Sequence, residues 1–500
     1  MDRCDRKNRR NARGPTQRIL PRGTDCSARF LQLGPCCSGR SKTCGDGAMT
    51  GALRKLVNRG SALAAGPIAR GSIVSVLIRI TGLTLSFVQA IIAARLLGVD
   101  GYGLVAVALS VAHIAAAFAL FGYGTLATRE IAGWLASGKQ HLLGKFARHA
   151  VVSVLGISAL SAIVIFAASP FLAEYRSVIL VAAAIIPAVA LIQLLRGMAQ
   201  GFGDVSAAQW PGEILRPAML IALVVCSLAF IPDVTAPGFL IMFAMASLCS
   251  ALAGAILVRR HMSARNTVER TANTETSDNP AFFGKAAPFF ALSMLAIVQG
   301  EFATIMLALF ASPEQAGLYQ PIARLTPIIA LPATAAAMRY APRVSEFWNS
   351  GQMSRLADVT RTYTLATCGL TTAVTITLAG LGPLILLAFG PDFTAVAPLL
   401  WIVGAGQIFN TATGPVGYLL TMTGHVRMAT ISKVLGVVAA LVAAVLLVPH
   451  YGATGAAIAV SVGLIAWNTA ALIATRRLLG FDPSLLQLIG RRQPATGREL

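Results

Sequence analysis

The sequence predicts an all-α membrane protein that crosses the bilayer many times, and three observations support this fold class. Hydrophobic residues make up 56% of the 500 residues, whereas only 12% are charged. Soluble domains carry roughly 25% charged residues. The chain also contains twelve long apolar runs, and its basic residues gather on alternate connections between them. The composition argues against a soluble enzyme, a DNA-binding factor and a disulfide scaffold.

Each apolar run is long enough to be a spanning helix, which needs roughly 20 mostly apolar residues. Proline within such a helix is tolerated as a kink, because neighbouring groups satisfy the freed backbone. We expect twelve spans, in two bundles of six, over residues 73–97, 102–126, 149–169, 177–195, 214–231, 238–258, 286–310, 316–338, 363–388, 394–421, 428–448 and 454–475.

The distribution of charge predicts the topology. From Arg54 onward there are thirty Lys and Arg residues, and twenty-six of them lie in the N-terminal approach, the even-numbered connections, the C-terminal tail or the adjoining ends of spans (Arg216 and Lys433). Arg176 is the only basic residue in the odd-numbered connections. Basic residues concentrate on the cytoplasmic side of membrane proteins. Both termini are therefore predicted to be cytoplasmic in a bacterial inner membrane. The net charge of +21 is therefore explained mainly by the orientation of the chain in the membrane, and we expect no nucleic-acid partner.

Composition also divides the chain into segments. Residues 1–48 hold eleven Lys and Arg and five of the eight cysteines. We interpret them as a disordered basic leader or a start assigned too early, with Met49 as the real start; an arm that binds anionic lipid headgroups is the alternative. The segments that follow are a basic approach (49–72), a six-helix bundle (73–258), a cytoplasmic linker (259–285), a second six-helix bundle (286–475) and a basic tail (476–500).

Two stretches indicate an internal repeat. Residues 94–104, between the first two spans, match residues 308–318 at an offset of 214, which superposes Gly103 on Gly317. The Pro232–Gly238 spacing before the sixth span also matches Pro449–Gly455 before the twelfth. Many transporters are built from duplicated bundles with a substrate site between them.

The run ARLLGVDGYGLVAVALSVAHIAAAFALFGYGTLATREIA (94–132) resembles the polysaccharide transporter family of the multidrug/oligosaccharidyl-lipid/polysaccharide exporter superfamily. RGMAQGFGD (196–204) and the PHYGATGAAIA turn are also similar to this family. The resemblance implies a V-shaped pair of six-helix bundles around a central cavity that opens alternately to each side. It also implies an undecaprenyl-diphosphate-linked glycan as the substrate.

Three ionisable residues lie well inside predicted spans: Arg79, Glu301 and Arg324. A charge at the bilayer centre costs ~2.5–3.5 kcal/mol, so it normally faces a cavity or a partner. One interpretation is a structural ion pair between Glu301 and Arg324, which lie at similar depth. The other is that both arginines line a cationic cavity for the diphosphate, since guanidinium groups match phosphate oxygens. Glu301 would then couple transport to a proton or sodium ion.

Further basic residues lie near the ends of spans. Arg196 and Arg216 are expected near the inner ends of the fourth and fifth spans, either snorkelling to the interface or lining a vestibule for the substrate headgroup. Arg95 has the corresponding place at the outer mouth. His113, in the second span, is interpreted as a packing residue.

The function that these features favour is a flippase for a lipid-diphosphate oligosaccharide in cell-surface polysaccharide biosynthesis. A charged headgroup cannot cross ~30 Å of hydrocarbon unaided. We expect no catalytic residues, cofactor or metal; the partners are the lipid-linked substrate, the bilayer and a glycan polymerase or glycosyltransferases. The alternatives are a small-molecule cation or drug antiporter of the same superfamily, and a membrane-embedded glycan polymerase or ligase, which the short outer connections disfavour.

Overall fold

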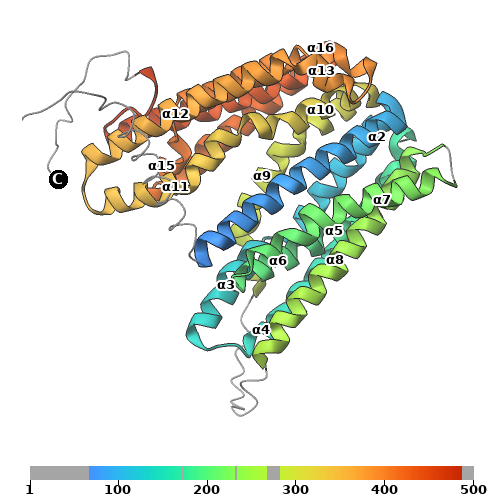
Figure 1. Cartoon of the computed structure of the whole chain (residues 1–500), viewed down its shortest axis with the longest axis horizontal. Helices are drawn as coiled ribbons and strands as arrows, with labels where there is room; N and C mark the ends of the chain where they lie inside the picture. Colours follow the sequence, from blue (N-terminus) through green and yellow to red (C-terminus); the bar gives the residue numbers. More distant parts are fainter. Residues whose placement is uncertain (1–66, 172, 231–232, 267–281, 487–500) are drawn as a thin grey trace, which may run out of the picture. The chain divides into compact units, whose positions relative to one another are not determined.

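The computed structural model describes residues 67–171, 173–230, 233–266 and 282–486, and this part of the chain is helical without strands (Figure 1). Residues 1–48, most of the approach 49–72 and most of the linker 259–285 lie outside the described residues, and so do the predictions made for them. The described chain falls into two halves, residues 67–266 and 282–486. We call them the N-half and the C-half.

The N-half begins with the long helix α2 and ends with α8, which continues beyond the predicted sixth span. Its fifth span begins earlier than expected, at Val205, because α6, a π-helical segment η3 and α7 follow one another without a break. The elements are α2 (Pro67–Leu120), α3 (Tyr123–Ser137), α4 (Leu142–Ala168), η1 (Ser169–Phe171), η2 (Ala173–Tyr175), α5 (Arg176–Gly201), α6 (Val205–Trp210), η3 (Pro211–Leu215), α7 (Arg216–Leu228) and α8 (Ala236–Asn266).

The C-half begins with α9 and ends with the long helix α16. Its eighth predicted span is divided between α10 and α11. The elements are α9 (Phe282–Phe310), α10 (Pro313–Ile329), α11 (Leu331–Asn349), α12 (Met353–Gly380), α13 (Gly382–Leu387), η4 (Pro391–Val396), α14 (Leu399–Ala412), α15 (Val416–Met422) and α16 (Val426–Leu479).

Two of the helices are too long for a single crossing. A straight helix of 54 residues would measure about 80 Å, against ~30 Å of hydrocarbon. Gly452 interrupts α16 with φ 51° and ψ −128°. A Cβ atom on Gly436 would lie 2.5 Å from the Cβ of Trp467, which a straight helix would place about 46 Å away, so α16 folds back on itself. Gly98 interrupts α2 at the predicted connection between the first two spans, with φ 67° and ψ −173°.

Among the described residues, nine helices are long and apolar enough to cross a membrane, counting α2 and α16 once each. The tenth predicted span, 394–421, is divided among η4, α14 and α15, and α14 has only 14 residues. The all-α membrane fold is therefore confirmed, whereas the count of twelve crossings stays a prediction.

The outward-facing side of α4 shows why this fold needs a bilayer. Large apolar side chains are exposed along it, including Val152, Leu160, Ile163 and Phe166, the last at 67%. The opposite side of the same helix buries Phe146 and Val154. Exposed apolar surface of this extent belongs against another apolar phase, which for a spanning helix is lipid.

The two halves meet at their outer ends through glycine. A Cβ atom on Gly103 would lie 1.8 Å from the carbonyl oxygen of Pro313, and one on Gly317 would lie 2.1 Å from that of Val99. Small residues let membrane helices approach this closely. Gly103 and Gly317 are also the pair that the offset of 214 superposes, so the repeat-equivalent positions of the two halves pack against each other.

Polar contacts reinforce the outer end. The Arg95 guanidinium donates to the carbonyl oxygens of Ala388 (2.8 Å) and Leu387 (2.6 Å), where α13 ends. The Tyr175 hydroxyl donates to the Ala308 carbonyl at 3.3 Å. Burial, followed by the neighbouring charge of Glu174, raises the pKa of Tyr175 to about 12, so this hydroxyl remains a donor at neutral pH. Both contacts join the N-half to the C-half.

Aromatic side chains join the halves at the opposite end of α9. Phe282 packs edge-on against Trp134 of α3 and Phe146 of α4, with ring centroids 6.2 and 5.3 Å apart. Phe121 stacks on Phe290, with centroids 4.7 Å apart. The first turns of α9 therefore pack against the N-half, although α9 opens the C-half.

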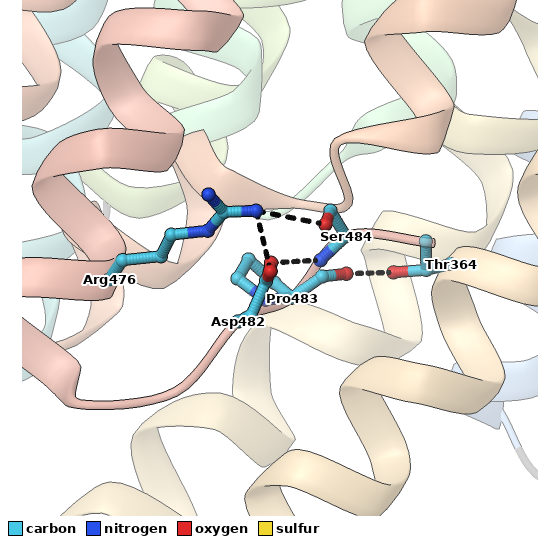
Figure 2. A network of polar contacts seen from close by, with 5 residues as sticks. All are labelled: Thr364, Arg476, Asp482, Pro483 and Ser484. Carbon is cyan, nitrogen blue, oxygen red and sulfur yellow. Dashed lines mark hydrogen bonds and ion pairs between the residues drawn. The ribbon is translucent and has the colours of Figure 1, made fainter. Parts of the chain in front are cut away.

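The segment after α16 folds back against the C-half (Figure 2). Arg476 donates to the carboxylate of Asp482 and to the hydroxyl of Ser484, and Thr364 donates to the carbonyl of Pro483 at 3.0 Å. The start of the predicted basic tail is thus hydrogen-bonded to α12 through Thr364 and Pro483.

Candidate functional site

The N-half positions its charged residues through a close helix contact. A Cβ atom on Gly82 of α2 would lie 2.7 Å from the carbonyl oxygen of Glu213, so only glycine allows this approach. The Ser75 hydroxyl also donates to Oε1 of Gln209 at 3.0 Å, and Gln209 lies on α6, four residues before Glu213. Arg79 lies four residues after Ser75 and three before Gly82, which places it on this same face of α2. Its side chain is exposed.

The π-helical segment carries the second part of the site. π-Helical turns are rare in proteins, and those that occur are often found at functional sites. Here Glu213 pairs with Arg196 of α5 at 3.0 Å. Arg216 follows on α7, interacts electrostatically with Glu213, and holds its guanidinium carbon 5.3 Å from the centroid of the Phe243 ring. Its Nε atom is buried and has no hydrogen-bond partner among the described residues. This donor is unused.

Arg324 brings the C-half into the cluster. It lies on α10, and its side chain is exposed. Its charge acts on Arg216 across the boundary between the halves. It also acts on the hydroxyl of Tyr102, a residue only 4% exposed. Two guanidinium groups from opposite halves therefore act on each other electrostatically, and the Nε donor of Arg216 is unused within the described residues.

Glu301 has partners that differ from the expected ones. Its carboxylate accepts a hydrogen bond from Ser110 at 2.7 Å and contacts His113 Nδ1 at 3.0 Å. Arg324 acts on it electrostatically but is not among the ion pairs formed within the described residues. The structure thus shows a contact between Glu301 and His113, and not the direct Glu301–Arg324 ion pair that was one of the two expectations from the sequence. Each of these two side chains is about a quarter exposed, at 26% and 27%.

Of the five residues predicted for the site, four occur in one electrostatic chain. Arg196 forms an ion pair with Glu213, which interacts electrostatically with Arg216. Arg324 interacts electrostatically with both Arg216 and Glu301. Arg79 lies on the α2 face beside Glu213. Their assignment to substrate and coupling ion stays a prediction.

The sequence does not predict Glu213, Ser110 or the contact of His113 with Glu301 as parts of the site. The predicted fifth span begins at residue 214, whereas the helical segment begins at Val205 and therefore includes Glu213, three residues before Arg216. The only indication in the sequence that His113 contacts Glu301 is that the two residues lie at comparable depth in their spans.

The cluster carries an excess of positive charge. It contains four guanidinium groups (Arg79, Arg196, Arg216 and Arg324) and two carboxylates (Glu213 and Glu301), which leaves an excess of two positive charges. Guanidinium groups bind phosphate oxygens through paired donors. Within the described residues, no three His, Cys, Asp or Glu side chains gather closely enough to hold a metal ion.

Comparison with solved structures defines the class of fold. The chain is similar to a multidrug resistance MATE family transporter of the MOP superfamily in an inward-facing conformation, with a TM-score of 0.62, 14% identity, and coverage of 82% of this chain and 98% of that one. It is also similar to the lipid II flippase MurJ in an inward closed conformation, with a TM-score of 0.60, 15% identity, and coverage of 81% and 87%. A Vibrio cholerae MATE transporter gives 0.52, 17% identity, and 82% and 98%.

The chain thus has the fold of the MOP-superfamily membrane transporters. The sequence profile of the polysaccharide biosynthesis protein family matches residues 68–348. The chain belongs to this family, and the resemblance drawn from the sequence is confirmed. No curated protein matches the chain.

Proposed function

We propose that the protein is a flippase that moves an undecaprenyl-diphosphate-linked oligosaccharide from the cytoplasmic to the outer leaflet of a bacterial inner membrane, by alternating access. The polysaccharide biosynthesis family and the transporter fold support this class of activity. The product would serve the assembly of O-antigen, capsule or exopolysaccharide, beside glycosyltransferases or a glycan polymerase. Both termini would be cytoplasmic.

The observation that carries the proposal is the electrostatic interaction between Arg216 and Arg324. They come from opposite halves, and the Nε donor of Arg216 has no hydrogen-bond partner among the described residues. Like charges repel, and an anion bound to both guanidinium groups would reduce the repulsion. A diphosphate that links a lipid to a sugar carries two negative charges, which equals the excess positive charge of the cluster.

Arg79 and Arg196 complete the proposed binding surface. Arg79 is exposed beside Glu213, and Arg196 is 38% exposed although it is paired. We assign them to the first contact with the headgroup as it arrives from the cytoplasm. The lipid tail would remain in the bilayer while the guanidinium groups replace the water around the phosphates.

The charge of the site separates this function from export of cationic drugs. A site for organic cations should carry net negative charge, and this cluster carries net positive charge. No bond needs to be made or broken, so the proposed flippase is not an enzyme.

Deletion of the gene in its host tests the proposal. The lipid-linked glycan should accumulate in the inner leaflet, where membrane-impermeant glycan-binding reagents do not reach it, while sensitivity to cationic drugs stays unchanged. Normal glycan export together with raised drug sensitivity would support the antiporter instead.

A further inference from the structure

A small cavity lies inside the N-half, between α5, the segment formed by α6 and η3, and α8. Its volume is about 10 Å³, and the residues that line it include Leu195, Ala207, Gly212 and Ser250. A water molecule needs roughly 10–15 Å³ of such room and two to four polar partners. The cavity therefore has room for a single water molecule, provided that polar groups surround it.

The hydroxyl of Ser250 is the first polar group of this cavity. Ser250 is 0% exposed, and its Oγ atom has no hydrogen-bond partner among the described residues. Gly254 faces α5 and η3, because a Cβ atom on it would lie 3.5 Å from Leu195 Cδ1 and 3.9 Å from Pro211 Cβ. Ser250 lies one turn earlier on the same face of α8. Since a buried hydroxyl without a partner costs free energy, a ligand that forms a hydrogen bond with it is favoured.

Two prolines remove the helical donors of two backbone carbonyls beside the cavity. Proline has no N–H group, so Pro211 cannot donate to the carbonyl of Ala207, four residues earlier. The N–H of Arg216 donates to the carbonyl of Pro211, five residues earlier. Pro217 has no N–H group either, so the carbonyl of Gly212 is left without its helical donor. Ala207 and Gly212 both line the cavity.

We propose that this cavity binds one water molecule, which accepts a hydrogen bond from Ser250 and donates to the carbonyls of Ala207 and Gly212. These three bonds equal the number that a buried water typically makes. Ordered water is one of the means by which membrane helices replace the backbone bonds that proline removes. The water therefore joins α8 to the π-helical turn of η3.

This water positions part of the charged cluster. The π-helical turn that it bridges carries Glu213 and directly precedes Arg216. Arg196, the ion-pair partner of Glu213, also lines the cavity. A π turn holds one residue more than an α-helical turn, so its loss would rotate Arg216 relative to α6 by about 100°. The water thus helps to keep these side chains in their present directions.

Radiolytic footprinting of the full chain in lipid nanodiscs tests the site. X-rays generate hydroxyl radicals from bound water, which oxidise adjoining side chains, whereas radicals made chemically in solution reach only surfaces open to bulk water. Leu195 is only 8% exposed and should be oxidised by X-rays but not by radicals from solution. Ser250→Val removes the hydroxyl and places methyl groups in the cavity, so this oxidation should be lost.

Ser247→Val is the matched control. Ser247 is as buried as Ser250 and has no hydrogen-bond partner among the described residues, but it is not one of the residues that line the cavity. Oxidation of Leu195 should therefore persist in this variant. Ser250→Ala, which removes only the hydroxyl, takes the place of Ser250→Val if the valine variant does not fold.

Hydrogen–deuterium exchange tests the role of the water in the π turn. Loss of one hydrogen bond should make the backbone amides of residues 205–216 exchange about fivefold faster in Ser250→Val than in wild type and Ser247→Val. An unchanged exchange rate in Ser250→Val would overturn the positioning role.

Three footprinting results would overturn the site itself. The first is no oxidation of Leu195 by X-rays in wild type, which would show a dry cavity. The second is oxidation of Leu195 by both kinds of radical, which would show a cavity open to bulk water. The third is oxidation by X-rays that persists in Ser250→Val.

Discussion

The charged cluster between the halves differs from the polar interior of the C-half. Helix α12 buries a row of neutral hydroxyls, each at most 2% exposed: Thr360, Thr364, Thr367, Thr371 and Thr375. The first three donate to carbonyl oxygens of their own helix at 2.7–3.0 Å. The cluster instead combines ionised side chains from both halves, several of them exposed.

The difference teaches where a membrane transporter can keep charge. A neutral hydroxyl can donate to a carbonyl of its own helix, or stay buried without a partner at a smaller cost than a charge, as Thr371 and Thr375 do within the described residues. A guanidinium group in the same place would need a partner or water. The charged cluster accordingly combines residues of both halves, and its members either pair with each other, as Arg196 and Glu213 do, or are exposed, as Arg324 is.

The largest effect is expected for Arg324→Ala. Removal of this guanidinium should lower transport at least ~tenfold, since hydrogen bonds to charged groups contribute roughly 1.5–3 kcal/mol. Glycan export would be measured in cells that produce normal amounts of the variant. Arg259→Ala, which removes an exposed arginine at the inner end of α8, is the matched control and should export normally. Normal export by Arg324→Ala would exclude this residue from the binding surface.

The next effect concerns the contact that joins the outer ends. Gly103→Ala places a methyl group against the backbone of Pro313 and should lower the free energy of unfolding by about 1–3 kcal/mol. Thermal unfolding of the purified chain in detergent measures this. Gly133→Ala, where a Cβ atom meets nothing within 4 Å, should be neutral or slightly stabilising. Equal melting of the two variants would mean that the glycine contact does not form.

A smaller effect is expected for Arg95→Ala at the same end. It leaves the carbonyl groups of Leu387 and Ala388 without their donor, but the side chain is exposed, so the loss should be about 1 kcal/mol. Arg95→Lys should recover part of it. A transport defect as large as that of Arg324→Ala would instead place Arg95 in the substrate path.

The smallest effect is expected in the neutral interior. Thr375→Val preserves the shape of the side chain, and the Thr375 hydroxyl has no hydrogen-bond partner within the described residues. Stability and transport should change by less than about 0.5 kcal/mol and twofold. A strong transport defect would show that this row has a functional role that the comparison denies it.

The sequence predicted the fold better than the site, for physical reasons. Apolar runs and charge alternation follow from the bilayer, so they identified the helices and both turns at Gly98 and Gly452. The boundaries of the apolar runs are less certain guides, because a segment such as Val205–Leu228 mixes polar and apolar residues, and the predicted span begins one residue after Glu213. The partnership of His113 with Glu301 depends on which spans become neighbours, and neither hydropathy nor charge encodes this.

Reconstitution of the full chain in liposomes tests the central claim most directly. A fluorescent undecaprenyl-diphosphate oligosaccharide is placed in both leaflets, and a membrane-impermeant glycosidase reports which molecules reach the outside. We expect wild type to make nearly all of the lipid accessible, Arg324→Ala and Arg216→Ala to leave the inner half protected, and a lipid-linked glycan without phosphates not to be moved. Equal transfer of the charged and uncharged lipids would contradict a site built to bind the diphosphate.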